Sequence, residues 1–193
     1  MAMAQKKISN LKSNLHKIFF VFLLGVIIFN VGNTIWQQKE KYLSTNYWQR
    51  YPGLKKAYYD SIYANKKGSW LPDETLYSFN GGALIKGVNP ILVNPEVSVL
   101  GKYIIGLFAL IFNNEHIAIL VFSAISLIML FLIGRQIFSS SIVAMTPLLF
   151  ISFEPIFLNQ LRYTPLLDII HLSFLLLTFY FFNVSLVSKK HVF

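Results

Sequence analysis

The chain has 193 residues and a formal net charge of +9; 55% of its residues are hydrophobic and none is cysteine. This composition predicts a polytopic membrane protein rather than a soluble domain, and the lack of cysteine excludes disulfide bonds and thiolate metal sites. The basic residues are spread over the N-terminus, one long polar segment and the C-terminus, which indicates topology signals and lipid-headgroup contacts rather than a nucleic-acid-binding surface.

The first hydrophobic run extends from Ile18 to Trp36. Four lysines precede it, as in the positively charged start of a signal peptide: Lys6, Lys7, Lys12 and Lys17. The run is long enough to cross a bilayer, and no pair of small residues marks a cleavage site after it. We therefore expect a retained signal anchor at 18–36 that leaves residues 1–17 in the cytoplasm.

Three later runs are also long enough to span, namely Ile117–Gly134, Ile137 to about Phe157, and Leu166–Val187. A fifth run, Val99–Phe112, is shorter and contains Lys102, which is typical of a helix at the membrane interface. The prediction is an all-α protein with four transmembrane helices, three of them within 116–188.

The basic residues favour this count. If 99–112 lies at the interface, then the N-terminal lysines, Arg135 and Lys189-Lys190 all face the cytoplasm. If 99–112 crosses instead, Arg135 and the C-terminal lysines face outward, against the usual bias. We therefore place residues 189–193 in the cytoplasm and the whole chain in the cell (plasma or inner) membrane.

The segment 37–115 then lies outside and contains aromatic residues suited to the headgroup region. Asp73 is expected to cap a first short helix that stops at Gly87. Asn94 and Pro95 are expected to start a second helix that runs to about Phe112. We expect both helices to lie along the outer surface of the membrane, and the Gly81-Gly82 pair to allow close helix packing.

Acidic residues are rare in this chain, with eight in total. The four-span topology places five charged side chains on the outer face: Asp73, Glu74, Glu154, Arg162 and Asp168. Asp73 is either a helix cap or a general base that deprotonates an acceptor hydroxyl. Glu74 either orients that acceptor or is an exposed first-turn acid.

The other charged residues each allow two interpretations. Arg162 could bind a phosphate or reach the membrane interface as a snorkelling side chain. Asp168 could pair with Arg162 or His171, or contact substrate. Lys102 could project toward a lipid phosphate or toward ordinary headgroups, and Glu154 could simply mark the membrane interface. The four histidines lack the spacing of a zinc or haem site.

Three segments together resemble a known family. They are "PDETLYSFNGGALIKGVNP", "NPEVSVLGKYIIGLFALIFNN" and "EPIFLNQLRYTPLLDI". In this order they are similar to the N-terminal part of the protein O-mannosyltransferase-like glycosyltransferases of the membrane C-type (GT-C) fold, from Pro72 to about Phe182. The resemblance implies juxtamembrane helices on the outer face, a polyprenyl-phosphate-linked sugar as donor, and a hydroxyl of a protein or glycan as acceptor.

The resemblance also implies roles for single residues. Asp73 matches the catalytic carboxylate and Glu74 its acidic neighbour. Lys102 of "LGK" and Arg162 match cations that bind the donor phosphate, with Asp168 and Glu154 in support. The implied reaction is a direct displacement with inversion, which requires no cofactor besides the lipid-linked donor; a metal is left open.

The chain also departs from the family pattern. Val97-Ser98-Val99 stand where His-Pro-Pro is common, and Leu120 or a neighbour stands where an arginine is often found. Family members also continue through many more spans. The alternative is therefore a non-catalytic membrane subunit, or a lipid-carrier-binding remnant of the same framework, that works with a partner subunit. A small transporter is disfavoured, because its spans would need polar groups near the midplane.

Overall fold

The structure is a computed structural model that describes residues 2–63 and 70–189. Within these residues the regular secondary structure is helical only, which confirms the all-α prediction. Residues 190–193 of the predicted cytoplasmic C-terminus lie outside the described residues, as do the side chains of Lys6, Lys7, Lys12 and Lys189.

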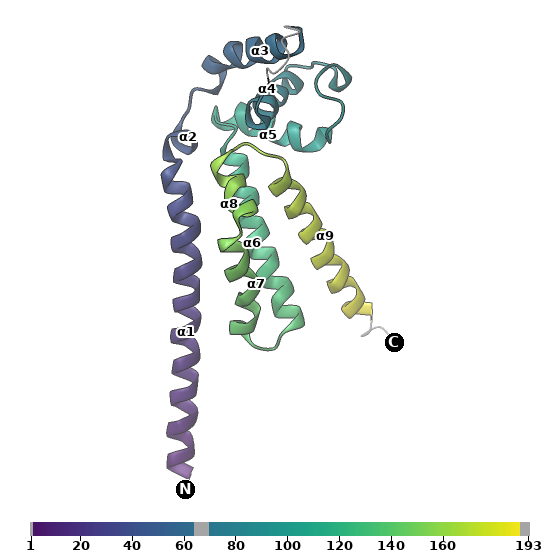
Figure 1. The fold of residues 1–193 in the computed structure, drawn as a ribbon. Helices are drawn as coiled ribbons and strands as arrows, with labels where there is room; N and C mark the ends of the chain where they lie inside the picture. The colour runs from purple at the N-terminus through teal and green to yellow at the C-terminus, as the bar shows by residue number, and fades with distance from the viewer. Residues whose placement is uncertain (1, 64–69, 190–193) are drawn as a thin grey trace.

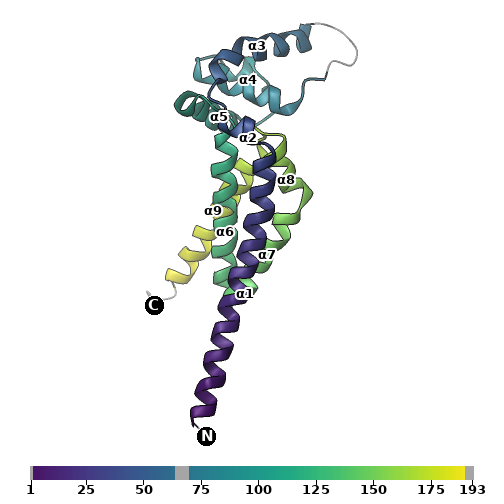
Figure 2. The ribbon, with the colours of Figure 1, turned by 90° about the vertical axis from the view of Figure 1, so that its left-hand side faces the viewer.

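Three helices are long and apolar enough to cross a membrane: α1 (Ala2–Gln37), α6 (Ile117–Ile137) and α9 (Asp168–Lys189). A fourth span is possible if α7 (Ser141–Phe153) and α8 (Pro155–Arg162) cross together as one bent unit. Figures 1 and 2 show α1, α6 and α7 running side by side, while α9 diverges from them. The chain is therefore a polytopic membrane protein.

The third span was predicted as one run from Ile137 to about Phe157. In the structure it breaks between α7 and α8, which are bent by 58°. Pro155 has no N–H and cannot continue the helical ladder. Glu154 is extended there and its carboxylate accepts a hydrogen bond from the Ile156 N–H at 3.5 Å, so that it caps α8. The Asn30 amide of α1 donates to the Ser152 carbonyl beside the break. This bond matters because a backbone carbonyl inside a membrane has no water to bond with.

The remaining helices gather at one end of the spans, where α1 ends and α6 begins (Figure 1). They are α2 (Lys39–Leu43), α3 (Tyr47–Tyr63), α4 (Asp73–Ile85), the 3-10 turn η1 (Pro90–Leu92) and α5 (Val99–Phe112). In both ribbon views α5 lies across the ends of the spans instead of beside them (Figure 2). This placement agrees with the expectation that 99–112 does not cross.

Glycines allow α4 and α5 to cross closely. A Cβ added at Gly106 would lie 2.2 Å from the Gly81 carbonyl oxygen, so neither helix could hold a larger residue there without moving apart. Gly82 is pressed against the rings of Tyr47 and Tyr51 from α3. The packing role predicted for Gly81-Gly82 is confirmed.

The predicted helix ends were partly wrong. Asp73 is the first residue of α4, and Pro72 rather than Asp73 occupies the cap position. The other end was correct: Gly87 has φ +81° and donates to Leu84, while Val88 donates to Ala83, which is a Schellman ending.

The helix expected to start at Asn94 begins only at Val99. Asn94 has φ 47°, in the left-handed region that a right-handed helix does not use. Its carbonyl accepts a hydrogen bond from the Lys102 ammonium, and the Val93 carbonyl lies 3.5 Å from the same atom. The lysine therefore holds this segment as a loop that folds back on α5.

Candidate active site at the α2–α5 end

The first turn of α4 and the first turn of α9 lie at the same end of the molecule (Figure 1). Asp73 and Asp168 are both exposed. Tyr77 lies one turn along α4 from Asp73, and its pKa is raised, first by burial and then by the charges of Asp73 and Asp168. Both carboxylates are therefore close enough to act on the same phenol, although they are 95 positions apart in the sequence (168 − 73).

Asp168 and Arg162 do not form the pair that the sequence suggested as one alternative. The Gln160 side chain donates to Asp168 Oδ2 at 2.9 Å. The Arg162 guanidinium lies 3.4 Å from Asn159 Oδ1 in its own helix, and the Arg162 main-chain carbonyl accepts from Lys41 Nζ at 2.9 Å. Arg162 is half-buried, so its head group keeps access to solvent.

Lys102 was expected to project from the surface of its helix, and this is wrong. Its residue is fully buried, and its ammonium donates to the loop carbonyls of Val93 and Asn94. Burial lowers the pKa of Lys102 from its ordinary value. A lysine held in this way must leave two backbone acceptors before it can reach a phosphate.

Glu154 also lies apart from the other candidates. It caps α8 at the bend, and Arg162 is the last residue of the same helix. At 1.5 Å per residue, α8 separates the two by about 12 Å. The structure thus gathers Asp73, Glu74 and Asp168 at one end and leaves Glu154 below them.

An ion pair that the sequence did not reveal, with a fully buried carboxylate, lies at this end of the molecule. The Glu115 side chain has no exposed surface, and Arg50 of α3 donates to both its oxygens, at 2.9 and 3.1 Å. The Ser78 hydroxyl of α4 donates to the same carboxylate at 2.6 Å. Tyr47 in turn donates to the Ser78 carbonyl at 2.6 Å. One carboxylate therefore ties α3 and α4 to the start of α6.

The neighbouring His116 precedes α6 and is buried with its Nε2 3.4 Å from Glu115. Burial lowers the pKa of His116 to about 4; the Glu115 charge opposes this effect, while Arg50 and Lys41 add to it. The imidazole is therefore neutral at pH 7. Its Nδ1 is buried and has no hydrogen-bond partner among the described residues.

Sequence reasoning treated residues 113–116 as the edge of a span and overlooked Glu115. A signal was present, because Glu115 is one of only eight acids and lies two residues before the apolar run that begins at Ile117. A carboxylate at that place is costly unless it is paired. Its partner Arg50 could not be identified, because 65 positions separate the two residues.

A polar cavity of about 250 Å³ joins this ion pair to the predicted site. Lys41, Arg50, Leu54, Glu74, Thr75, Ser78, Glu115, His116 and Thr164 line it. A second hollow of about 230 Å³ shares Lys41, Arg50 and His116 with it. Glu74 is thus the predicted catalytic residue that faces this cavity directly, beside Asp73 in the chain.

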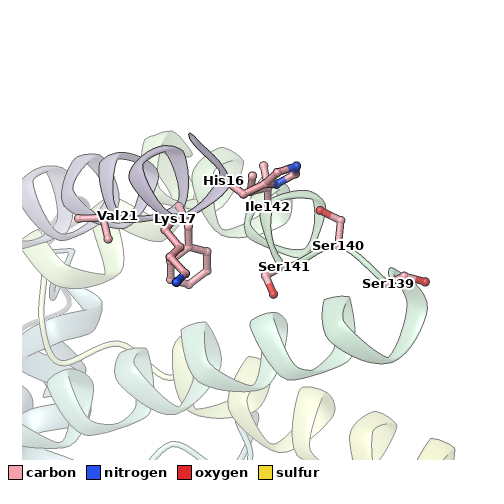
Figure 3. A pocket seen from close by; sticks show the side chains of 8 residues that line it. His16, Lys17, Val21, Ser139, Ser140, Ser141 and Ile142 are labelled. Atoms are coloured by element: carbon pink, nitrogen blue, oxygen red, sulfur yellow. The ribbon is translucent and has the colours of Figure 1, made fainter. Parts of the chain in front are cut away.

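A larger hollow of about 850 Å³ lies toward the opposite end of the spans. Figure 3 shows its lining side chains, which come from α1, from the turn before α7 and from the first residues of α7. His16 and Lys17 are exposed there. No group of three or more His, Asp or Glu side chains suited to a metal occurs at either end within the described residues.

Comparison with known proteins gives a family match. The sequence model of the dolichyl-phosphate-mannose-protein mannosyltransferase family matches residues 96–191. No curated protein and no solved structure matches the chain. The matched part covers α5 to α9 and includes Lys102, Glu115 and Asp168, whereas Asp73 and Glu74 precede it. Over residues 96–191 the protein therefore belongs to the dolichyl-phosphate-mannose-protein mannosyltransferase family, as the resemblance predicted.

Proposed function

We propose that this protein is an integral-membrane glycosyltransferase. It would transfer a mannose-like sugar from a polyprenyl-phosphate donor to a hydroxyl group of a protein or glycan. The family match supports the glycosyltransferase class. One structural observation supports the site: the first-turn acids of α4, the first-turn acid of α9 and a polar cavity occur at the same end of the spans.

In this proposal Asp73 is the general base. The acceptor hydroxyl gives its proton to the Asp73 carboxylate while its oxygen attacks the anomeric carbon of the donor sugar. The bond between that carbon and the phosphate oxygen breaks, and polyprenyl phosphate leaves with the electron pair. Attack from the side opposite the phosphate inverts the anomeric configuration. Glu74, beside Asp73, would orient the acceptor, and Asp168 would support the site from α9.

The leaving phosphate needs a cation, because charge develops on it as the bond breaks. Arg162 suits this role better than Lys102. Arg162 is half-buried as a residue, and its guanidinium has one long contact with Asn159, at 3.4 Å. Lys102 is fully buried and already donates to loop carbonyls.

We place the α2–α5 end outside the cell membrane and the N-terminus inside. Lys17 and Arg135 support this orientation, since both lie toward the ends of α1 and α6 that are remote from the cavity. The chain has no native cysteine, so Asp73→Cys and Asp168→Cys would give clean single-site labels. An impermeant reagent should reach both from the same side; labelling from opposite sides would refute the shared site.

The central test is transfer from polyprenyl-phosphate mannose by the purified chain in lipid nanodiscs. Asp73→Asn should reduce transfer by about 100-fold or more, as expected for loss of a general base. Asp60→Asn is the matched control, because Asp60 is an exposed acid on α3. Transfer by Asp73→Asn at the parent rate would remove Asp73 from the base role.

A second candidate function is a non-catalytic membrane subunit that binds the lipid carrier for a partner enzyme. The occupied ammonium of Lys102 favours it, because that lysine cannot stabilise a leaving group while it holds the 93–94 loop. Under this function the parent chain would bind polyprenyl-phosphate mannose but transfer no sugar unless the partner is added. Turnover by the purified chain alone would exclude it.

A further inference from the structure

The cavity beside Glu115 has polar walls of balanced charge. Lys41 and Arg50 supply two positive groups, and Glu74 and Glu115 supply two negative ones. The other polar lining groups are three hydroxyls and the neutral His116 ring. A phosphate placed here would face two carboxylates as well as two cations, so the site has no net attraction for an anion.

Two polar atoms in these walls have no hydrogen-bond partner among the described residues. They are His116 Nδ1 and Thr164 Oγ1, and their residues are 6% and 1% exposed. The Tyr42 hydroxyl lies near the Thr164 side chain, and the Thr164 main chain lies near the His116 ring, but neither contact gives these atoms a hydrogen bond. A buried polar atom without a partner is costly, so a ligand that completes both bonds is stabilised when it binds here.

The shape and chemistry fit a neutral ligand with several hydroxyl groups. Each hydroxyl can donate to a carboxylate and accept from a cation or an imidazole N–H. The volume of about 250 Å³ lies just below the usual range of ligand pockets, which begins near 300 Å³, and therefore fits one small ring better than an extended chain. Glu74 also borders the proposed base, so a ring bound here would lie next to Asp73.

We propose that this cavity binds a single glycosyl unit, with His116 and Thr164 hydrogen bonding to its hydroxyl groups. The inference rests on the proposed function and deepens it, because it assigns the sugar-binding walls to Arg50, Glu115, His116 and Thr164, which the sequence did not single out for this role. The glycosyl unit is either the sugar of the lipid donor or the terminal sugar of a glycan acceptor.

Thr164→Val tests the proposal with little change of shape, because it replaces only the hydroxyl by a methyl group. The full chain in nanodiscs is titrated with three probes: polyprenyl-phosphate mannose, unglycosylated polyprenyl phosphate and methyl mannoside. Thr164→Val should weaken the binding of a mannosyl probe roughly fivefold, the effect of one lost hydrogen bond. Binding of unglycosylated polyprenyl phosphate should stay within about twofold of the parent.

Ser123→Ala is the matched control. The Ser123 hydroxyl is also buried without a partner, but it lies in α6 and does not line the cavity. It should leave all three affinities unchanged. His116→Gln provides a second variant, which should weaken the same mannosyl probe that Thr164→Val weakens.

The probes separate the two sources of the sugar. A loss for the mannosyl lipid alone assigns the cavity to the donor, and a loss for methyl mannoside assigns it to a glycan acceptor. Equal weakening of glycosylated and unglycosylated lipid, unchanged mannosyl binding in both variants, or no mannosyl binding by the parent would each overturn the proposal. Asp73→Asn distinguishes the two proposals. If this variant binds the mannosyl probes as the parent does but transfers no sugar, the result supports Asp73 as the base and leaves the cavity inference unchanged.

Discussion

The two hollows at opposite ends of the spans differ in what lines them. The larger, at about 850 Å³, has the exposed side chains of His16 and Lys17 in its wall. The smaller, at about 250 Å³, contains a carboxylate with no exposed surface that is bonded to Arg50 and Ser78. Volume alone would select the end opposite to the proposed site. Buried polar groups that are bonded to specific partners indicate a candidate site better than volume does, because burying a polar or charged group is costly.

The smaller cavity also depends on how its walls are held. Its lining residues come from α2, α3, α4, the start of α6 and the segment after α8. Glu115 joins three of these elements through Arg50 and Ser78, and the Gly81–Gly106 crossing fixes α4 on α5. Variants that loosen these contacts should affect the cavity end of the molecule and leave the other end as it is.

The largest effect is expected from Gly106→Ala. The added Cβ would lie 2.2 Å from the Gly81 carbonyl oxygen and 2.6 Å from Ile85 Cγ1, so α4 and α5 must separate. We expect a loss of about 3 kcal/mol in the free energy of unfolding, typical of severe overpacking. Denaturant unfolding in detergent, followed by circular dichroism, measures it.

Gly32→Ala is the control for that variant. No atom lies within 4 Å of a Cβ added at Gly32 in α1. Alanine is also the better helix former, so stability should stay the same or rise by less than about 1 kcal/mol. If Gly106→Ala were as stable as Gly32→Ala, the close crossing of α4 and α5 would not exist in the protein.

Glu115→Gln should have the next largest effect. It keeps the shape of the side chain but removes the charge that pairs with Arg50 at 2.9 Å. Removing one partner of a buried pair costs about 3–5 kcal/mol, but the Arg50 side chain is 38% exposed and can turn to water, so we expect about 2 kcal/mol. Glu96→Gln, at an exposed loop acid, should cost less than about 0.5 kcal/mol. Equal losses in the two variants would mean that the Glu115 pair does not stabilise this end.

The acid sensitivity of the two ends should also differ. His116 has a pKa of about 4 in the folded chain and 6.5 as its ordinary value, so the unfolded chain binds more protons between these pH values. Stability from the neutral imidazole is complete above pH 6.5 and is lost as the pH falls toward 4. Between pH 6.5 and 5.5 the loss should be about 1 kcal/mol. Groups that face the ring are Glu115, Arg50 and Lys41.

Two variants assign that pH dependence. His116→Gln should remove this part of the loss, because glutamine does not titrate. His16→Gln, at the exposed histidine of the larger hollow, should retain it. Thermal unfolding midpoints measured across this pH interval compare the three proteins. If His116→Gln unfolds with the same pH dependence as the parent, His116 is not the group responsible.

Hydropathy and charge were sufficient to predict three of the spans, the short apolar run at 99–112 and the stop at Gly87, because each depends on residues close together in the sequence. The bend at Glu154-Pro155 was partly readable, since the residue before a proline disfavours helix and Glu154 was expected to mark the membrane interface, but the third span was expected to continue to about Phe157. The Arg50–Glu115 pair and the burial of Lys102 were not readable. Both depend on which distant or loop groups the folded chain brings near, and a single sequence does not contain that information.

The smallest effect is expected within the spans, where polar contacts are sparse. The Ser173 hydroxyl of α9 lies 2.8 Å from the Ser126 hydroxyl of α6 and donates to the Phe122 carbonyl at 2.6 Å. Figure 1 shows α9 diverging from α6, so these contacts join the two helices near the end where they meet. Ser173→Ala should cost about 0.6 kcal/mol, the average for such bonds in membrane helices.

A double-mutant cycle with Ser126→Ala decides whether this bond joins the helices. If the hydroxyls act on each other, the double variant should lose less than the sum of the two single losses. Thr178→Val is the control, because the Thr178 hydroxyl is exposed and donates to Phe174 within α9. Strictly additive losses would mean that the two hydroxyls do not act on each other. In that case Ser173 would still join α9 to α6 through the Phe122 carbonyl, and Ser126 would take no part in that link.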